Sequence, residues 1–303
     1  MYYKTISPLL ALLACVVFIS GCDRKLSVHN ADVGEVELAY YTRGSGDPLL
    51  MIMGFRGTMS YWDPALLELL EKKYTLILFD NRGVGLSSDT EQDMTTIDQM
   101  ADDTAGLIKA LGYSKVHVLG WSMGSRIAID LSIRYPELVN GLILCSPNPG
   151  GQHQSKRTDN DYKVLTAETL SQEEGLSLIF PKTMEGEQAS KSFVERITKA
   201  VIDGRVPEDI NVKAETIIRQ VRALQLWDES EEYYDKLPTI KSPTLVAGGL
   251  MDVLDSPENV QTVANRIPFA WAAFFPGAGH DFLSQDYKHF AELVILFLEA
   301  NRI

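Results

Sequence analysis

The sequence has few basic residues, few cysteines and no repeats. Its 28 Lys and Arg stand against 41 Asp and Glu, which gives a formal net charge of −13. Because no basic cluster offsets this excess, nucleic-acid binding is not expected. No spacing of His, Cys, Asp and Glu is typical of a metal site. With 45% hydrophobic and 23% charged residues, the composition is that of an ordinary globular protein, and nothing in it indicates an obligate protein partner.

Only three cysteines are present, and two of them precede residue 23. Cys15 lies in an apolar stretch of 11 residues, Leu9–Ile19, that follows Lys4. A bilayer span needs about 20 apolar residues, so this stretch is too short for a comfortable transmembrane helix and is typical of a secretory signal. It ends in "ISGC", which resembles the lipobox of bacterial lipoproteins. In that pattern residues 1–21 are removed as a signal peptide and the cysteine, here Cys22, is lipidated.

The lipobox resemblance implies a protein anchored by lipid to a membrane of the bacterial cell envelope. Asp23 is similar to an inner-membrane retention signal, which favours the periplasmic face of that membrane. A plain signal peptide cut nearby and an uncleaved anchor are the alternatives. Residues 22–34 are then expected to form a polar tether. Cys145 is the one cysteine left in the mature domain, so no internal disulfide is expected.

Beyond the tether, strand and helix patterns alternate. The stretch from Val36 to Phe55 alternates in polarity and turns at "GSGDP", which predicts a hairpin. Apolar runs typical of buried parallel strands then follow one another, with helical patterns between them. The runs cover 49–53, 75–80, 115–121, 141–146, 243–249 and 271–275, and the helical patterns cover 61–71, 96–111, 124–135, 257–266 and 285–301. The sequence therefore predicts an α/β fold with a mostly parallel central sheet flanked by helices.

The alternation breaks between residues 148 and 241. This stretch is polar at first and then helical in pattern, as in "AETIIRQVRALQLW", and it separates two predicted strands. A plain crossover between parallel strands needs far fewer residues. We therefore expect a helical cap, 148–241, inserted into a core formed by residues 35–147 and 242–303.

Ser122 is the candidate nucleophile. It lies in "GWSMG", Gly120–Gly124, between a predicted strand and a predicted helix. A tight strand-to-helix turn strains the central residue and crowds its neighbours, which favours glycine two residues to either side. Such a turn presents the serine Oγ at the carboxyl end of the sheet, where open α/β sheets bind ligands. The alternative is a glycine-lined turn with an incidental serine.

A serine hydroxyl needs a base to become a nucleophile, and His280 is the candidate base. Of the five histidines, it lies in a glycine-rich loop, "PGAGHDF", directly after a predicted strand, from which it can reach Ser122. Asp252, at the end of another predicted strand, is the expected acid that orients the imidazole. Asp255 remains a rival, whereas Asp281 adjoins His280 too closely in the chain to reach its ring productively.

An oxyanion hole completes the predicted site. The backbone N–H groups of Phe55 and Met123 are its expected donors. Met53, Gly54 and Trp121 are expected to line an apolar substrate pocket around them.

Together these motifs resemble the capped serine hydrolases of the α/β-hydrolase fold. The resemblance runs from Val36 to Asn301 and rests on "GSGDPLLMIMGF", "LFDNRGVGLSS", "GWSMGS", "LPTIKSPTLVAGGLMD" and "PGAGHDF", with the serine, aspartate and histidine in that chain order. Many members have His-Gly where this chain has Met53-Gly54. Because the oxyanion donor is a backbone group, the hole should survive this difference.

The resemblance implies a hydrolase that forms an acyl-enzyme and needs no cofactor. Its expected substrates are small molecules, namely carboxylic esters of small or medium apolar acids. Carbon–carbon bond or amide (aminopeptidase-like) hydrolysis by the same triad is one alternative. A non-catalytic ligand-binding lipoprotein is the other.

Two further features lie beside the predicted site. Arg56 and Arg126 flank it and could hold a substrate carboxylate, although arginines near helix starts are more often solvated or paired. The segment "RGVGLSS" has a lone G-x-G without the third glycine and the acidic partner of a dinucleotide-binding loop, so we expect it only to flank the active-site edge.

Overall fold

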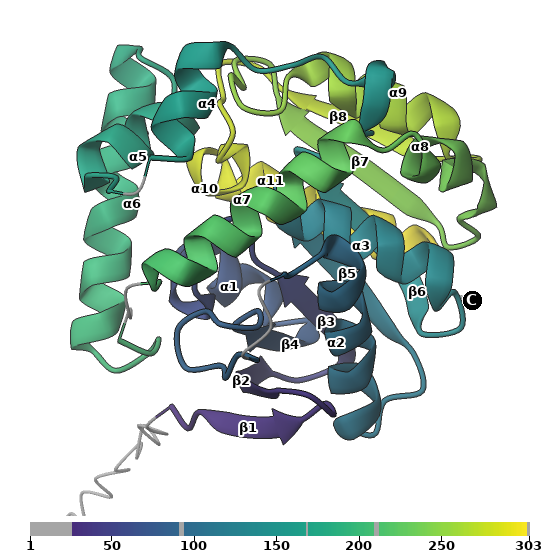
Figure 1. The fold of residues 1–303 in the computed structure, drawn as a ribbon. Coiled ribbons are helices and arrows are strands. Elements are labelled where there is room, and N and C mark those ends of the chain that lie inside the picture. The colour runs from purple at the N-terminus through teal and green to yellow at the C-terminus, as the bar shows by residue number, and fades with distance from the viewer. Residues whose placement is uncertain (1–25, 91–93, 168, 209–211, 302–303) are drawn as a thin grey trace, which may run out of the picture.

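The computed structural model describes residues 26–90, 94–167, 169–208 and 212–301 (Figure 1). The predicted signal peptide and Cys22 lie outside the described residues. Within the described ranges, no helix combines the length and the apolar character needed to cross a membrane.

An eight-stranded sheet forms the centre of the molecule, with the strand order β1-β2-β4-β3-β5-β6-β7-β8. β1 and β2 run antiparallel at one edge, and β3 to β8 are parallel to one another. This confirms the predicted mostly parallel sheet. The strands are β1 (His29–Asp32), β2 (Glu37–Gly44), β3 (Asp47–Ile52), β4 (Tyr74–Phe79), β5 (Val116–Trp121), β6 (Val139–Cys145), β7 (Thr244–Gly249) and β8 (Trp271–Phe275).

The predicted hairpin at "GSGDP" is wrong in its pairing. The chain does reverse there, with Gly44 and Gly46 at φ 81° and 124°. However, β4 lies between β2 and β3 and pairs with both. Turn residues specify a local reversal, whereas the partner of a strand depends on which apolar strand fills the sheet beside it.

The predicted tether over residues 22–34 is also too long. His29–Asp32 form the edge strand β1, which pairs with β2. Only Ala31 in this strand is buried. An edge strand is hydrogen-bonded along one side and exposed along the other, so a polar sequence is compatible with it.

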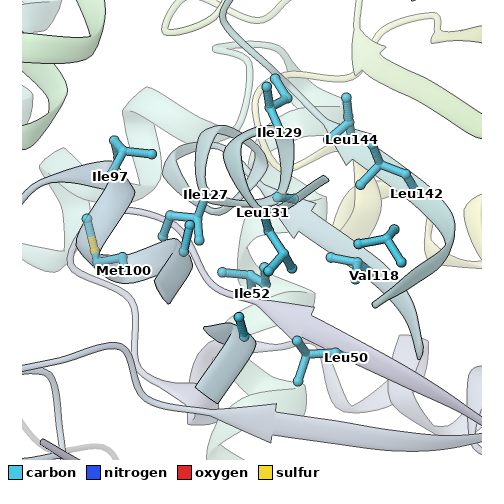
Figure 2. Packing of buried hydrophobic residues seen from close by; sticks show 14 of the residues in the cluster. Leu50, Ile52, Ile97, Met100, Val118, Ile127, Ile129, Leu131, Leu142 and Leu144 are labelled. Carbon is cyan, nitrogen blue, oxygen red and sulfur yellow. The ribbon is translucent and has the colours of Figure 1, made fainter. Parts of the chain in front are cut away.

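Alternate residues of the strands enter two hydrophobic cores, one on each face of the sheet. Leu50 and Ile52 of β3 belong to one cluster, and Leu49 and Met51 belong to the other, because successive side chains of a strand point to opposite faces. Figure 2 shows the first cluster, with Ile127 of helix α3 (Met123–Arg134), which follows β5, beside the strand residues. Each fully buried aliphatic side chain contributes about 1.5–3 kcal/mol.

Five helices cover the two faces of the sheet. α2 (Ile97–Ala110), α3 (Met123–Arg134) and α9 (Pro257–Arg266) contribute to the first core, and α1 (Pro64–Leu70) and α11 (Tyr287–Ala300) contribute to the second. α1 begins later than predicted, because Asp63 caps it and Pro64 stands at its first position. The short helix α10 (Phe282–Gln285) precedes α11.

The described residues between β6 and β7 form helices. They are α4 (Asp159–Leu165), α5 (Gln172–Ile179), α6 (Met184–Ile202), α7 (Ala214–Glu229) and α8 (Glu232–Lys236), with short 3-10 helices at Gly151–His153 and Leu237–Thr239. Figure 1 shows α5 and α6 beside the core and α7 lying across it. The hydroxyl of Thr216 on α7 donates to the carbonyl of Gly83 at 2.9 Å, so the cap is bonded to a core loop.

Candidate active site

Ser122 occupies a strained turn between β5 and α3. Its φ of 57° and ψ of −119° are unusual for a residue with a side chain. Its N–H donates to the carbonyl of Cys145 at 2.9 Å. A Cβ added at Gly120 would lie 2.2 Å from the oxygen of Gly124, and one added at Gly124 would lie 2.0 Å from the oxygen of Ile52. Both flanking glycines are therefore required by the turn, and the strain is held by the surrounding backbone.

His280 and Asp252 are brought together from segments 28 residues apart. His280 Nδ1 lies 2.8 Å from Asp252 Oδ2, and both side chains are buried. The other oxygen of Asp252 accepts the N–H groups of Leu254 and Asp255, at 2.8 and 3.0 Å. One carboxylate oxygen is thus fixed by the backbone while the other faces the imidazole, which leaves Nε2 of His280 available on the far side of the ring.

The pKa of His280 is raised above its ordinary value of 6.5. Burial alone disfavours the charged imidazolium, but the neighbouring Asp252, with a smaller contribution from Asp255, outweighs it. The surroundings are therefore arranged to stabilise a proton that His280 has accepted.

The two rival carboxylates have other partners. Asp255 bonds to Arg126 and Asn148, both at 3.0 Å. Asp281 accepts the N–H of Ser284 at 3.2 Å and caps α10. Of the three candidates, Asp252 is the one that the structure brings into contact with the imidazole.

Ser122 and His280 line the same small cavity of about 60 Å³, together with Gly54 and Phe55. No direct hydrogen bond joins the serine hydroxyl to the imidazole among the described residues. In unliganded active sites such bonds are often long and tighten only when substrate is bound. The two side chains thus share one space into which a reacting group could enter.

The expected oxyanion donors both lie close to Ser122. Met123 is the first residue of α3, so its N–H is one of those that a helix leaves without an internal acceptor, at the positive end of the helix dipole. The other expected donor comes from the loop after β3, where a Cβ added at Gly54 would lie 3.1 Å from the Cβ of Ser122. The backbone that leads into Phe55 therefore passes directly beside the nucleophile.

A larger cavity of about 650 Å³ adjoins the small one. Phe55 and Trp121 line both cavities, and cap side chains such as Leu165 and Ile179 close them. This volume is within the range of small-molecule sites. The cap therefore forms one wall of the space that leads to Ser122.

Met53 does not line this space, contrary to the sequence prediction for it. Its side chain is fully buried in the second hydrophobic core, with Leu49 and Met51. The strand alternation of β3 continues one residue beyond its end and turns Met53 to the other face of the sheet. Its carbonyl accepts the side-chain amide of Asn81 at 3.2 Å, so it supports the loop from behind. Gly54 and Trp121 do line the cavity.

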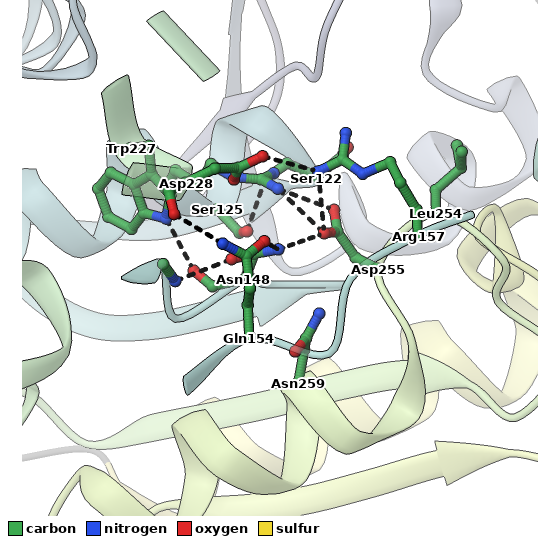
Figure 3. A network of polar contacts seen from close by, with 12 residues as sticks. Ser122, Ser125, Asn148, Gln154, Arg157, Trp227, Asp228, Leu254, Asp255 and Asn259 are labelled. Carbon is green, nitrogen blue, oxygen red and sulfur yellow. Dashed lines mark hydrogen bonds and ion pairs between the residues drawn. The ribbon is translucent and has the colours of Figure 1, made fainter. Parts of the chain in front are cut away.

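The two flanking arginines have different surroundings. Arg126 is 1% exposed and pairs with the buried Asp255. Burial opposes the charge of Asp255, but Arg126 and Arg157 lower its pKa to about 2. Asn148 joins this network through Asp255, and Asp228 joins it through Arg157 at 3.4 Å (Figure 3). Arg126 thus serves as a buried ion-pair partner, whereas Arg56 lines the larger cavity.

Several cap groups that hold the site were not predicted from the sequence. Gln220 Oε1 accepts the N–H of Arg56 at 3.0 Å, next to the predicted oxyanion donor Phe55. The carbonyl of Ile179 accepts the N–H of Asp281 at 3.0 Å, beside the histidine. These residues carry no motif, because their partners lie far away in the chain. Among the residues that the structure describes, no cluster of three His, Cys, Asp or Glu is placed to hold a metal ion.

The chain belongs to the alpha/beta hydrolase fold family, whose model matches residues 47–287. A proposed non-heme bromoperoxidase, BpoC of Mycobacterium tuberculosis, is 30% identical over 251 residues, which are 81% of this chain and 91% of that protein. The pimeloyl-acyl-carrier-protein methyl ester esterase of Nitrosomonas europaea is 25% identical over 244 residues, 79% of this chain and 90% of that one.

A similar solved structure agrees with this family. An alpha/beta hydrolase fold protein from Chitinophaga pinensis has a TM-score of 0.80 at 24% identity, covering 91% of this chain and 98% of that chain. The family supports an enzyme of the hydrolase type, and its relatives differ in the chemistry that their names state, so the fold alone does not fix a substrate.

Proposed function

We propose that this protein is a serine hydrolase that cleaves carboxylic esters of small or medium apolar acids through an acyl-enzyme. The observation that carries the proposal is the 2.8 Å contact between Asp252 and His280, beside a serine in a strained strand-to-helix turn that lines the same cavity as the histidine. Nucleophilic acyl transfer requires a serine with a histidine beside it as the base, and a carboxylate that orients the histidine.

In the acylation step, Ser122 Oγ attacks the ester carbonyl while His280 Nε2 takes the hydroxyl proton. Asp252 stabilises the imidazolium that forms, in keeping with the raised pKa of His280. The amides of Phe55 and Met123 donate to the tetrahedral oxyanion, each contributing about 3–4 kcal/mol to stabilisation of the transition state. The C–O bond then breaks, and the imidazolium protonates the departing alkoxide.

In the deacylation step, water replaces the alcohol. His280 takes a proton from that water as it attacks the acyl carbonyl, and the same two amides hold the second oxyanion. Collapse of this intermediate breaks the bond to Ser122 Oγ, which recovers its proton from His280. The acid leaves and the free enzyme is restored.

The cavity favours an apolar acyl group. Its wall combines Phe55 and Trp121 of the core with cap side chains such as Leu178 and Ile217. An aliphatic chain that leaves water for this surface gains about 0.8 kcal/mol per methylene. Cleavage of amides or carbon–carbon bonds would use the same nucleophile, so the preference for esters over these substrates must be tested by comparing rates.

A panel of substrates tests the proposal. Short nitrophenyl esters, aminoacyl amides and vinylogous diketones are each assayed as substrates of the wild type and of the variants Ser122→Ala and Ser132→Ala. Ser132 lies on α3, the helix that follows Ser122, and its hydroxyl bonds only to the carbonyl of Ala128 within the described contacts, so it controls for loss of a hydroxyl. We expect ester turnover that Ser122→Ala abolishes and Ser132→Ala retains. Faster amide or diketone turnover would contradict the ester assignment.

We also propose that Cys22 carries lipid and tethers the enzyme to the bacterial cell envelope. The "ISGC" segment supports this. Fatty-acid labelling of the full chain in a bacterial host is expected to mark wild type and not Cys22→Ser, with the variant released from the membrane fraction. Equal labelling of both proteins would contradict the anchor. Cys15→Ser, which also removes a thiol, is the control and should be labelled like the wild type.

A further inference from the structure

The larger cavity carries a single kind of charge. Among the described residues that line it, Arg56 is the one that carries a charge, and the others are apolar or neutral. An acidic residue on this wall would have offered the guanidinium an internal partner. Within the described residues the cavity therefore presents a cation in a largely apolar wall.

Arg56 differs in this respect from the other arginines around the site. Arg126 and Arg157 pair with acids of the buried network. Arg196 pairs with Asp63, and Arg219 pairs with Asp89. No carboxylate lies within ion-pair distance of Arg56 in the described ranges. Its pKa is lowered by burial, yet a guanidinium stays charged at neutral pH.

The position of Arg56 is fixed, although no acid among the described residues compensates its charge. Its φ is 61°, its N–H donates to Gln220, and its Nη2 donates to the carbonyl of Ala167. The guanidinium lies 5.3 Å from the centre of the Phe55 ring. Its Nε and the Nε2 of Gln220 are buried and have no hydrogen-bond partner among the described residues. Buried donors of this kind are rarely left unsatisfied, and a strained backbone often marks a ligand-binding position.

We propose that Arg56 binds a free carboxylate of the substrate, so that the preferred substrates are esters that also carry an acid group, such as half-esters of dicarboxylic acids. This inference rests on the proposed serine hydrolase function and specifies its substrate class. The apolar wall receives the methylene chain, and Arg56 receives the carboxylate at its far end. The ester carbonyl lies at Ser122. The ester C–O bond breaks and the alcohol leaves, water then cleaves the acyl bond to Ser122 as in the deacylation step above, and the product is a dicarboxylic acid.

Equilibrium binding to Ser122→Ala protein tests the inference without any turnover. Half-esters of dicarboxylic acids in a chain-length series are compared with the same compounds capped as neutral diesters. For at least one length we expect the acid to bind about 10- to 100-fold more tightly, the typical gain from a charge-assisted hydrogen bond. Arg56→Gln added to Ser122→Ala should remove the difference, and Arg56→Lys should restore part of it. Arg222→Gln, on the exposed side of α7, removes the same charge away from the cavity and should keep the difference.

Equal binding of acids and neutral diesters at every length, or a preference that Arg56→Gln retains, would overturn the inference. Ser122-dependent hydrolysis of neutral esters by the wild type would then still support the proposed function. In the reverse case, Arg56-dependent binding of acids without any Ser122-dependent hydrolysis would support the carboxylate site and contradict the serine hydrolase.

Discussion

Trp121 Nε1 donates a hydrogen bond of 3.0 Å to the carbonyl oxygen of His280. The residue before the nucleophile thus holds the loop that carries the base, and the two rings lie 5.6 Å apart. This contact joins the end of β5 to the segment after β8, the two parts of the chain that the proposed mechanism must keep in register.

Trp121→Phe should therefore lower kcat more than it changes KM. The variant keeps an aromatic ring and loses the N–H that fixes His280. Loss of one such bond corresponds to about a 10-fold decrease in kcat. Steady-state kinetics on a nitrophenyl ester measure it. Trp62→Phe is the matched control, because the indole N–H of Trp62 is buried without a partner among the described residues, and its kcat should be unchanged. Equal effects of both variants would contradict a positioning role for Trp121.

The pH dependence of the reaction should report the raised pKa of His280. The imidazole acts as a base only when it is neutral, so kcat/KM should fall as the pH drops through a pKa above 6.5. Asp252→Asn removes the main group that raises this pKa. This variant should shift the acidic limb of the pH profile of kcat/KM to lower pH and reduce kcat by about 10⁴-fold.

Asp286→Asn provides the control for that profile. Asp286 also faces the Nδ1 of a histidine, His289, at 2.8 Å, but the pair is exposed. Its replacement should leave the acidic limb and kcat in place. A limb that stays fixed in Asp252→Asn would contradict the assignment of His280 as the titrating base.

The buried network around Asp255 should be important for stability. Asp255→Ala leaves Arg126 buried without its carboxylate, and breaking a buried pair in this way typically costs about 3–5 kcal/mol. Chemical denaturation measures the loss. Glu299→Ala breaks an exposed pair with Lys73 instead and should cost less than about 1 kcal/mol. Similar losses in the two variants would contradict the network's structural role.

Asp281 should make stability fall as pH rises. Burial, with Asp63 nearby, raises its pKa to about 8 from 3.8. Between these values the folded state keeps a proton that the unfolded chain has lost, so the free energy of unfolding decreases by up to about 1.4 kcal/mol per pH unit. Asp281→Asn, which keeps an acceptor for Ser284, should show a slope smaller by about one proton in denaturation measured from pH 5 to 8. Equal slopes of the free energy of unfolding against pH in the wild type and in Asp281→Asn would contradict a protonated Asp281.

The sequence was most informative where chemistry is encoded locally. Gly120 and Gly124 predict the turn at Ser122, because a side chain at either position would collide with backbone. Continuous apolar runs predict the parallel strands, and the sheet and the membership of the alpha/beta hydrolase fold family are confirmed. β5 and β8 are parallel, so the residues that follow them, Ser122 and the loop with His280, lie at the same edge of the sheet. This placement can be predicted without knowledge of individual contacts.

The rest depends on contacts between distant segments. The "GSGDP" turn could not show that β4 enters between β2 and β3, and Met53 could not be assigned to a face without the exact end of its strand. Gln220 lies in a cap without motifs, so its bond to Arg56 had no signal in the sequence. Arg126 has an acid partner and Arg56 has none among the described residues, and this difference likewise appears only when their surroundings are seen in three dimensions.

Covalent labelling with a fluorophosphonate probe tests the central proposal most directly. Intact-mass measurement and peptide mapping should find one adduct, on Ser122, in wild type and in Ser132→Ala, and none in Ser122→Ala. An adduct formed equally by wild type and Ser122→Ala would contradict the proposal that Ser122 is the nucleophile.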